Sequence, residues 1–293
     1  MKKLTQNNSN NIEPLLREKN VAEFFAGIGL MRLGLERDGW NVAFANDIEP
    51  DKYQMYATNF PDAPEHFLLD DIHKLSPRNV PDVALATASF PCNDLSLAGG
   101  RTGLEGKQSS AFWGFIRILE EMGTRKPPIV LLENVVGFLT SHEGRDFQTA
   151  LLALNRVGYS VDAMIIDAER FVPQSRVRMF VIGSLQGGKG AWEVRESQVF
   201  YESDVRPKAL ASFIFEHPEI AWNIRKVPAL PKRNISLQEI LEDLPPDSDF
   251  WWNRQRTDYL VNKMSERHDS ILREMMNGRK WSYGTVFRRM RYC

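Results

Sequence analysis

Short apolar runs alternate with amphipathic segments along residues 21–185. The runs have the length of strands, and the segments between them carry apolar residues at helical spacing. This pattern predicts strands over residues 21–25, 41–47, 65–72, 83–90, 128–134, 159–167 and 178–185, and helices over residues 30–39, 111–123 and 146–158. Strands that alternate with helices are typical of βαβ units, in which helices cover both faces of a mostly parallel sheet. The pattern therefore predicts an α/β fold.

The alternation ends near residue 186, where glycine-rich and then proline-spaced sequence begins. One further segment there, residues 236–244, has a helical pattern, and Ser236 and Glu239 have the spacing of a capping box at its start. We therefore expect three regions: a polar N-terminal extension over residues 1–20, a main domain over residues 21–185, and a smaller irregular region over residues 186–293.

Composition narrows the class of protein. Hydrophobic residues make up 43% of the 293 residues, but no apolar run approaches the roughly eighteen residues that cross a membrane. The polar N-terminus lacks the apolar core of a signal peptide, so we expect a cytoplasmic protein. The two cysteines, Cys92 and Cys293, are expected to be free thiols, because nothing in the sequence argues for an oxidising compartment.

The net charge is −1, but basic side chains are concentrated near the C-terminus. Residues 278–293 contain no acidic residue and interleave aromatic with basic side chains: Arg279, Lys280, Trp281, Tyr283, Phe287, Arg288, Arg289 and Arg291. Such a stripe suits a phosphate backbone. A solvated basic tail explains the same feature equally well.

Ligands of parallel α/β sheets bind at the carboxyl ends of the strands, so the residues there are candidate site residues. The first strand ends in Gly27-x-Gly29, which allows a ligand to approach the backbone. The dinucleotide fingerprint requires a third glycine where this chain has Arg32, which disfavours a pyrophosphate site. The second strand ends in Asp47, whose carboxylate can accept hydrogen bonds from ribose hydroxyls. Together these features favour a nucleoside ligand such as S-adenosylmethionine, and a purely structural turn is the alternative.

Other strand ends carry reactive groups. Cys92 follows the apolar run over residues 83–90 in a polar loop, which presents a thiol, although most unpaired cysteines are core residues. Glu133 ends the fifth apolar run, where a helix cap or a salt-bridge partner is the ordinary alternative. Arg176 and Arg178 lead into the last predicted strand, on one side of an extended segment.

Six blocks of sequence contain these residues: "FAGIGL", "NDIEPDKYQMYATNF", "DDI", "FPCNDLSLAGGRTGL", "LLENVVGFL" and "FVPQSRVRMFVIG". In this order and at these spacings, residues 21–184 resemble the DNA (cytosine-5) methyltransferases. The resemblance implies the Rossmann-like fold of S-adenosylmethionine-dependent methyltransferases and methyl transfer to C5 of cytosine in DNA. It also implies the modification enzyme of a restriction-modification system, associated with a bacterial or phage nucleoid.

The resemblance implies a covalent mechanism. Cys92 matches the family's nucleophile, which adds to C6 because C5 of cytosine is itself a poor nucleophile. Glu133 matches the acid that meets the charge developing at N3. Arg176 and Arg178 match the family's arginine pair, and a nearby guanidinium favours the thiolate of the cysteine. C5 then takes the methyl group and loses its proton, which releases the cysteine.

The resemblance also implies the cofactor and the partner. The residues that it places around S-adenosylmethionine are Phe25, Ala26, Gly27, Ile28, Gly29, Asp47, Ile48, Asp71, Ile72 and Pro91. Among them, Asp47 is expected on the ribose, Ile48 against the purine, and Asp71 with Ile72 at the adenine. The expected partner is double-stranded DNA, whose target base must be flipped out of the stack to be reached. No metal is expected.

Two features depart from the family's pattern. Asn93 follows the cysteine where most members have glutamine, which leaves the nucleophile intact. The family's last two motifs are not found, so residues 186–293 are interpreted as a linker and a partial target-recognition region. Three interpretations stay open: the larger half of a methyltransferase completed by a second polypeptide, a truncated product, or an inactive relative that binds DNA. An RNA-modifying relative is disfavoured because the loop around Cys92 resembles the DNA-modifying branch.

Overall fold

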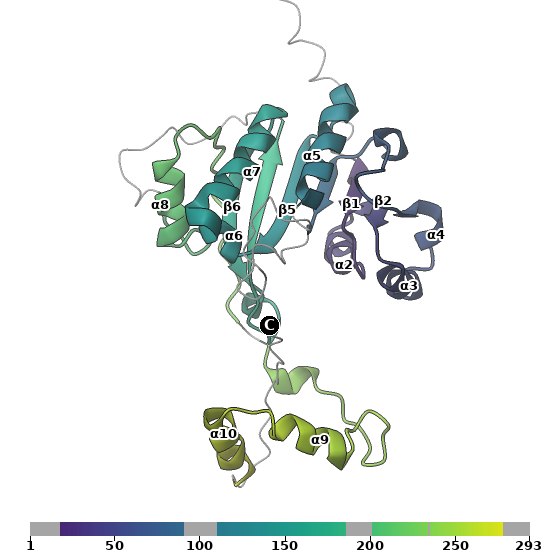
Figure 1. Ribbon diagram of the computed structural model, residues 1–293, viewed down its shortest axis with the longest axis vertical. Coiled ribbons are helices and arrows are strands. Elements are labelled where there is room, and N and C mark those ends of the chain that lie inside the picture. The colour runs from purple at the N-terminus through teal and green to yellow at the C-terminus, as the bar shows by residue number, and fades with distance from the viewer. Residues whose placement is uncertain (1–17, 91–109, 186–200, 234, 278–293) are drawn as a thin grey trace, which may run out of the picture. The chain divides into compact units, whose positions relative to one another are not determined.

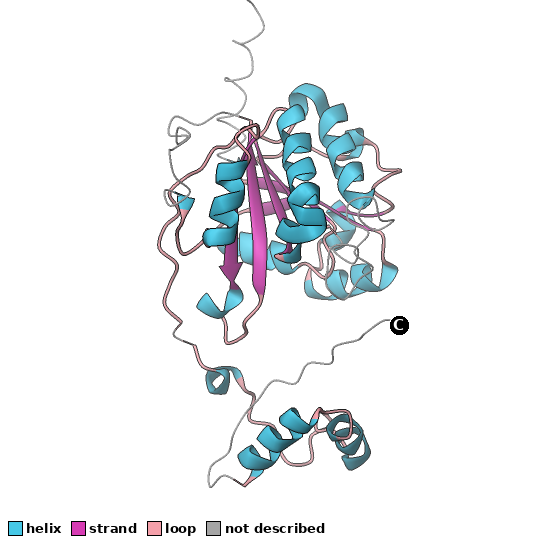
Figure 2. Cartoon of the chain, turned by 60° about the vertical axis from the view of Figure 1, so that its left-hand side comes forward, coloured by secondary structure: helices cyan, strands magenta, loops and turns pink. Residues whose placement is uncertain are grey.

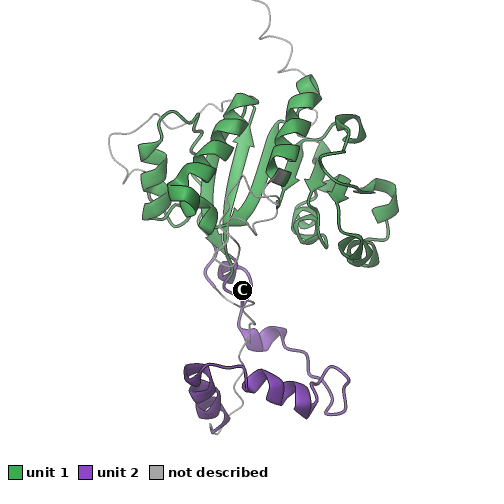
Figure 3. Cartoon of the chain, in the orientation of Figure 1, with its two compact units in different colours: residues 1–167, 176–230, 292–293 green, residues 168–175, 231–291 purple. Residues whose placement is uncertain are grey.

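The computed structural model describes residues 18–90, 110–185, 201–233 and 235–277. These residues form two compact units (Figure 3). Of the described residues, the first unit contains those up to 167 and those in 176–230, and the second contains 168–175 and those in 231–291.

A seven-stranded sheet forms the centre of the first unit (Figure 1). Its strands are β1 (Asn20–Phe24), β2 (Asn41–Asp47), β3 (Phe67–Leu69), β4 (Leu85–Ala88), β5 (Ile129–Val135), β6 (Ser160–Asp167) and β7 (Val177–Ser184), in the order β3-β2-β1-β4-β5-β7-β6. The first five in this order are parallel, and β7 runs antiparallel to both of its neighbours. The predicted mostly parallel α/β sheet is confirmed, and all seven strands lie within or overlap the predicted segments.

Two apolar cores lie on the two faces of this sheet, because alternate strand residues point to opposite faces. On β1, Ala22 and Phe24 belong to the larger core, and Val21 belongs to the smaller one. The larger core is covered by α5 (Ser110–Met122), α6 (Gly137–Thr140) and α7 (Arg145–Arg156). The smaller core is covered by α2 (Leu30–Arg37), α3 (Pro50–Asn59) and α4 (Ala63–His66). Figure 2 shows the strands enclosed between helices.

Residues 201–230 belong to the first unit, although the sequence pattern places a domain boundary near residue 185. Helix α8 (Lys208–Glu216) buries one side in the larger core through Leu210, Ala211, Phe213 and Ile214. The segment also extends the outer edge of β6, because Ile165 donates a backbone hydrogen bond to Val205 and Val161 donates one to Ala221. The interpretation of residues 186–293 as a linker and recognition region stays a prediction.

A buried ion pair fixes this segment to β6. The Arg206 guanidinium lies 2.7 Å from the Asp162 carboxylate, and the backbone N–H of Arg225 donates to the same carboxylate at 3.0 Å. Both charged side chains are buried. A buried pair of this kind adds little net stability when intact, but the loss of one partner leaves an uncompensated charge.

The second unit contains two short helices, α9 (Arg254–Val261) and α10 (Glu266–Met276), capped by Asn253 and Ser265. The helix predicted over residues 236–244 is wrong in length, since only a single 3₁₀ turn, Leu237–Ile240, forms there. Its predicted cap is present, because the Ser236 N–H donates to Glu239 Oε1 at 2.8 Å. Ile240 and Leu241 are exposed, and a short helix without a packed face is not stable.

We expect Arg206→Met to destabilise the first unit by about 3 kcal/mol, because Asp162 would stay buried without its counter-charge. Urea denaturation followed by circular dichroism measures the change. Lys208→Met is the matched control, because Lys208 is an exposed basic residue of the same segment. Equal stability of the two variants would contradict a structural role for the ion pair.

Candidate active site at the carboxyl ends of the strands

The loop after β1 combines strained backbone with close packing. Phe25, Gly27 and Gly29 all have positive φ, at 58°, 58° and 86°. A Cβ on Gly29 would lie 2.3 Å from the Phe60 ring, so this glycine is required for packing against α3. A Cβ on Gly27 would meet no atom closer than 3.9 Å, so the space beside Gly27 is open. The two glycines therefore differ, and only Gly27 leaves room for a ligand.

Arg32, which stands in place of a third glycine, is itself buried and forms a network that fixes α2 to α3 and α4. Its guanidinium donates to both carboxylate oxygens of Asp62, at 2.9 and 2.8 Å, and its Nε donates to Glu36 at 2.7 Å. It also bonds to the Tyr56 hydroxyl at 3.2 Å. The hydrogen bond from Arg32 lowers the pKa of Asp62. Arg32 thus stabilises the packing of α2 against α3 and α4 behind the loop.

Asp47 joins the carboxyl ends of β1 and β2. Its carboxylate is only 4% exposed and accepts the backbone N–H of Gly27 at 2.9 Å and that of Glu49 at 3.0 Å. Lys52 Nζ lies 3.5 Å from the same carboxylate. The next residue, Ile48, is 57% exposed, so an apolar side chain faces water directly beside the loop.

The predicted adenine residues lie in the turn after β3. The Asp71 carboxylate accepts the backbone N–H of His73 at 3.0 Å. The Ile72 side chain is 4% exposed and packs in the larger core against Gly114 of α5. Arg117 of α5 holds the turn by donating to the carbonyl oxygens of Ile72 and Leu75, at 3.0 and 2.8 Å. The structure therefore places Ile72 in the core, and its contact with adenine stays a prediction.

Glu133 and Arg178 form an ion pair at the carboxyl end of β5. Arg178 Nε lies 2.8 Å from Glu133 Oε1, and both side chains are partly exposed. The antiparallel register of β7, in which Arg178 pairs with Val135, brings the arginine to this edge. Arg176 is exposed, and its backbone N–H donates to Asp167 at 2.7 Å. The structure thus brings two of the four predicted catalytic residues into contact.

The end of β4 lies beside this pair. The Asn134 amide, next to Glu133, lies 3.5 Å from the carbonyl oxygen of Phe90, at the limit of a hydrogen bond. Pro91 and Cys92, which follow Phe90, lie outside the described residues. Among the residues that are described, no cluster of His, Cys, Asp or Glu could hold a metal ion. In the same part of the chain, no helix has the length and apolar character of a membrane span.

Sequence reasoning missed Glu23, a buried carboxylate near the carboxyl end of β1. The side chain is 2% exposed, and its Oε2 has no hydrogen-bond partner among the described residues. Burial raises the pKa of Glu23 to about 8. A lone acid inside the apolar run "VAEFF" was the available signal.

Comparison with known proteins identifies the family of the chain. Residues 19–292 match the family model described as C-5 cytosine-specific DNA methylase. The chain is 33% identical over 162 residues to the Type II methyltransferase M.NgoBI of Neisseria gonorrhoeae, covering 55% of this chain and 49% of that protein. It is 35% identical over 168 residues to M.DsaV of Dactylococcopsis salina, covering 57% and 46%. The chain therefore spans about half the length of the curated relatives that it matches.

Solved structures share the fold. A DNMT2 mutant from Spodoptera frugiperda matches with a TM-score of 0.55 at 20% identity, covering 77% of this chain and 60% of that one. The methyltransferase EhMeth of Entamoeba histolytica matches with a TM-score of 0.51 at 22% identity, covering 64% and 61%. The predicted methyltransferase fold is confirmed by these likenesses.

We expect Glu23→Gln to stabilise the protein at pH 8 and to change little at pH 5. The pKa of Glu23 is near 4.5 in the unfolded chain and about 8 in the folded one, so the folded state binds more protons between these values. Stability contributed by this group is therefore lost progressively as pH rises from about 4.5 to about 8, whereas glutamine mimics the protonated acid throughout. The gain at pH 8 is up to about 4 kcal/mol.

Thermal unfolding at the two pH values, with Glu65→Gln as an exposed control, measures the difference. A shift of the same size at both pH values would contradict the raised pKa.

Proposed function

The chain belongs to the C-5 cytosine-specific DNA methylase family, and on this premise we propose that it methylates C5 of cytosine in DNA through a covalent cysteine adduct. The observation that carries the proposal is the ion pair of Glu133 and Arg178, beside the end of β4 that leads to Cys92. The Type II relatives support a role in modification within a restriction-modification system.

S-adenosylmethionine is the cofactor of this family, and when bound it supplies the methyl group. The residues beside the loop after β1 fit an adenosine-containing ligand. Gly27 has open space next to it, and Ile48 exposes an apolar side chain that a purine would cover. Asp47 holds the backbone of Gly27, and we propose that the same carboxylate reaches the ribose. Contacts from the other predicted cofactor residues, including Asp71, are part of the same proposal.

Cys92 is proposed as the nucleophile. Its thiolate forms a bond from Sγ to C6 of cytosine, and the electron pair of the C5–C6 double bond moves toward C5 and N3. Glu133 donates a proton or a hydrogen bond to N3, and Arg178 orients that carboxyl group through the ion pair. After C5 has gained its methyl group, loss of the C5 proton and cleavage of the S–C6 bond release Cys92.

Double-stranded DNA is the proposed partner. The target carbon is inaccessible in a stacked duplex, so the base must be flipped out. The second unit presents groups that suit a nucleic acid, since Trp251 and Trp252 are exposed and the Arg256 guanidinium lies 4.1 Å from the Trp252 ring. Basic and aromatic side chains together can contact phosphates and bases.

Covalent trapping tests this function. DNA of mixed sequence in which 5-fluorocytosine replaces cytosine should form an adduct with the chain in the presence of S-adenosylmethionine, because fluorine cannot leave C5 as a proton does. We expect Cys92→Ser to abolish the adduct and to leave S-adenosylmethionine binding near normal, because the thiol acts on the base. Denaturing electrophoresis detects the adduct.

Formation of the adduct by the Cys92→Ser variant would contradict the assignment of Cys92 as the nucleophile. A gel shift of the DNA without any adduct from the wild-type chain would support a DNA-binding protein without turnover.

We expect Arg178→Met to lower kcat by about 100-fold and to leave cofactor affinity unchanged, because the ion pair to Glu133 serves the base. Single-turnover methylation and calorimetry separate the two effects. Arg156→Met is the control, because Arg156 is an exposed arginine at the end of α7. Unaltered turnover in the Arg178 variant would remove Arg178 from the mechanism.

A further inference from the structure

A neutral histidine is part of the network around Arg32. His66, at the end of α4, lies with its Nε2 atom 3.1 Å from Arg32 Nη1 and 3.3 Å from the Tyr56 hydroxyl. A guanidinium has only N–H donors, so Nε2 must accept this hydrogen bond and carries no proton. The His66 side chain is only 8% exposed. The contact with Arg32 therefore exists only while the imidazole is neutral.

Among the described residues, the charged and titratable groups that face His66 lie on neighbouring elements. They are Arg32 and Glu36 on α2, Tyr56 on α3, and Asp62 directly before α4. The Asp62 carboxylate lies 3.8 Å from His66 Nδ1, too far for a hydrogen bond, and is already paired with Arg32. Burial, followed by the charge of Arg32, lowers the pKa of His66, and the neighbouring carboxylates only partly oppose this shift. Protonation of His66 would thus place a second cation against the Arg32 guanidinium.

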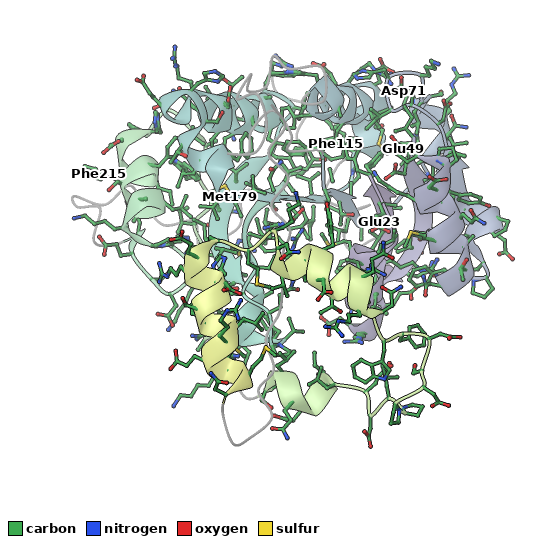
Figure 4. The ribbon with its side chains drawn as sticks, turned by 60° about the horizontal axis from the view of Figure 1, so that its bottom comes forward. Glu23, Glu49, Asp71, Phe115, Met179 and Phe215 are labelled. Atoms are coloured by element: carbon green, nitrogen blue, oxygen red, sulfur yellow. The ribbon has the colours of Figure 1, made fainter. Side chains whose placement is uncertain are left out.

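The same network supports the loop after β1. Arg32 lies in the first turn of α2, whose N-cap is Gly29, and its Cζ lies 4.1 Å from the centroid of the Phe60 ring. That ring fills the space beside Gly29, where a Cβ would lie 2.3 Å from it. The backbone N–H of Arg32 hydrogen-bonds to Glu23, which Figure 4 shows in the same part of the first unit as Glu49. A displacement of Arg32 would therefore reach the loop through both its side chain and its backbone.

We propose that His66 is a positioning residue: as a neutral imidazole it holds Arg32 and the loop after β1 in the arrangement that S-adenosylmethionine requires, and its protonation releases the loop. The inference rests on the cofactor of the proposed function. Once released from the network, the imidazole regains its ordinary pKa of 6.5, so protonation favours the released form below that pH. The contribution of His66 is therefore present above pH 6.5 and is lost as the pH falls below this value.

Calorimetric titration of the chain with S-adenosylmethionine at pH 7.5 and pH 5.5 tests this role. We expect the affinity of the wild-type protein to fall by about three- to tenfold at the lower pH, because a group with an ordinary pKa of 6.5 takes up one proton over this range. His66→Gln keeps a neutral acceptor for Arg32, so it should match the wild type at pH 7.5 and bind about three- to tenfold more tightly than the wild type at pH 5.5. His66→Leu, which has no acceptor, should bind about fivefold more weakly than the wild type at pH 7.5.

The comparison separates His66 from other titrating groups. Glu23, whose pKa is raised to about 8 by burial, is present in every variant, so its titration cancels. His268→Gln, at an exposed histidine of α10, is the matched control and should keep the pH dependence of the wild type. Circular dichroism at pH 7.5 verifies that each variant is folded.

Hydrogen–deuterium exchange provides a second readout, which does not need the cofactor. The peptide that spans residues 25–36 is compared between the wild type and His66→Gln at the same pH, so that intrinsic exchange rates cancel. We expect equal exchange at pH 7.5 and up to about tenfold faster exchange in the wild type at pH 5.5, because protonation of His66 stabilises the released loop.

The possible failures are distinguishable. Equal exchange of the two proteins at pH 5.5, or parallel affinity profiles, would overturn the inference and leave the proposed function intact. Equal affinity of His66→Leu and the wild type at pH 7.5 would show that the acceptor is dispensable and would also overturn it. Failure of the wild-type protein to bind S-adenosylmethionine at pH 7.5 would overturn the cofactor of the proposed function, and this inference with it.

Discussion

The direction of β7 is the constraint on which the candidate site depends. In a parallel orientation, the first residues of this eight-residue strand would lie roughly 25 Å away, at the opposite edge of the sheet. In the observed antiparallel orientation, Arg178 pairs with Val135 and its guanidinium contacts Glu133. The loop after β1 and the end of β4 reach the same edge, because their strands run parallel to β5. The antiparallel strand β7 therefore brings the Arg178 guanidinium to the edge of the sheet at which the parallel strands end.

Buried polar side chains hold this edge together where the ladder of backbone hydrogen bonds stops. Asp47 accepts from the backbone N–H of Gly27, and Asn46 donates to the carbonyl oxygens of Leu68 and Asp70 at 2.9 and 2.8 Å. Each bond connects one strand end with its neighbour and satisfies a group that burial would otherwise leave unpaired. The protein's own hydrogen bonds therefore fix the positions of these strand ends, and fixed positions are needed to hold reacting groups in place.

The sequence was sufficient for the seven strands of the sheet and for α2, α5 and α7, because periodicity depends on local pattern. The strand-end rule also placed Gly27, Asp47 and Glu133 at the edge where the structure has them, and their roles stay predictions. The sequence was insufficient where a role depends on the direction of one side chain. Ile72 follows two acids at a strand end, and whether it faces ligand or core depends on the turn that Arg117 holds. The unpaired, buried state of Glu23 was not predicted, because an acidic residue within an apolar run does not indicate which groups surround it. Arg32 was noticed only as a missing glycine, since Asp62, which accepts two of its hydrogen bonds, lies thirty residues further along the chain.

The buried acids of the first unit differ in how their charge is balanced. Among the described residues, these acids are Glu23, Asp47, Asp146 and Asp162. Asp162 is paired with an arginine, Asp47 accepts two backbone N–H groups, and Asp146 accepts from Ser141 and contacts His142 at 2.9 Å. Glu23 alone among them keeps an oxygen without a partner. Because an unpaired buried oxygen costs free energy, Glu23 lowers the stability of the first unit in a way that the other three acids do not.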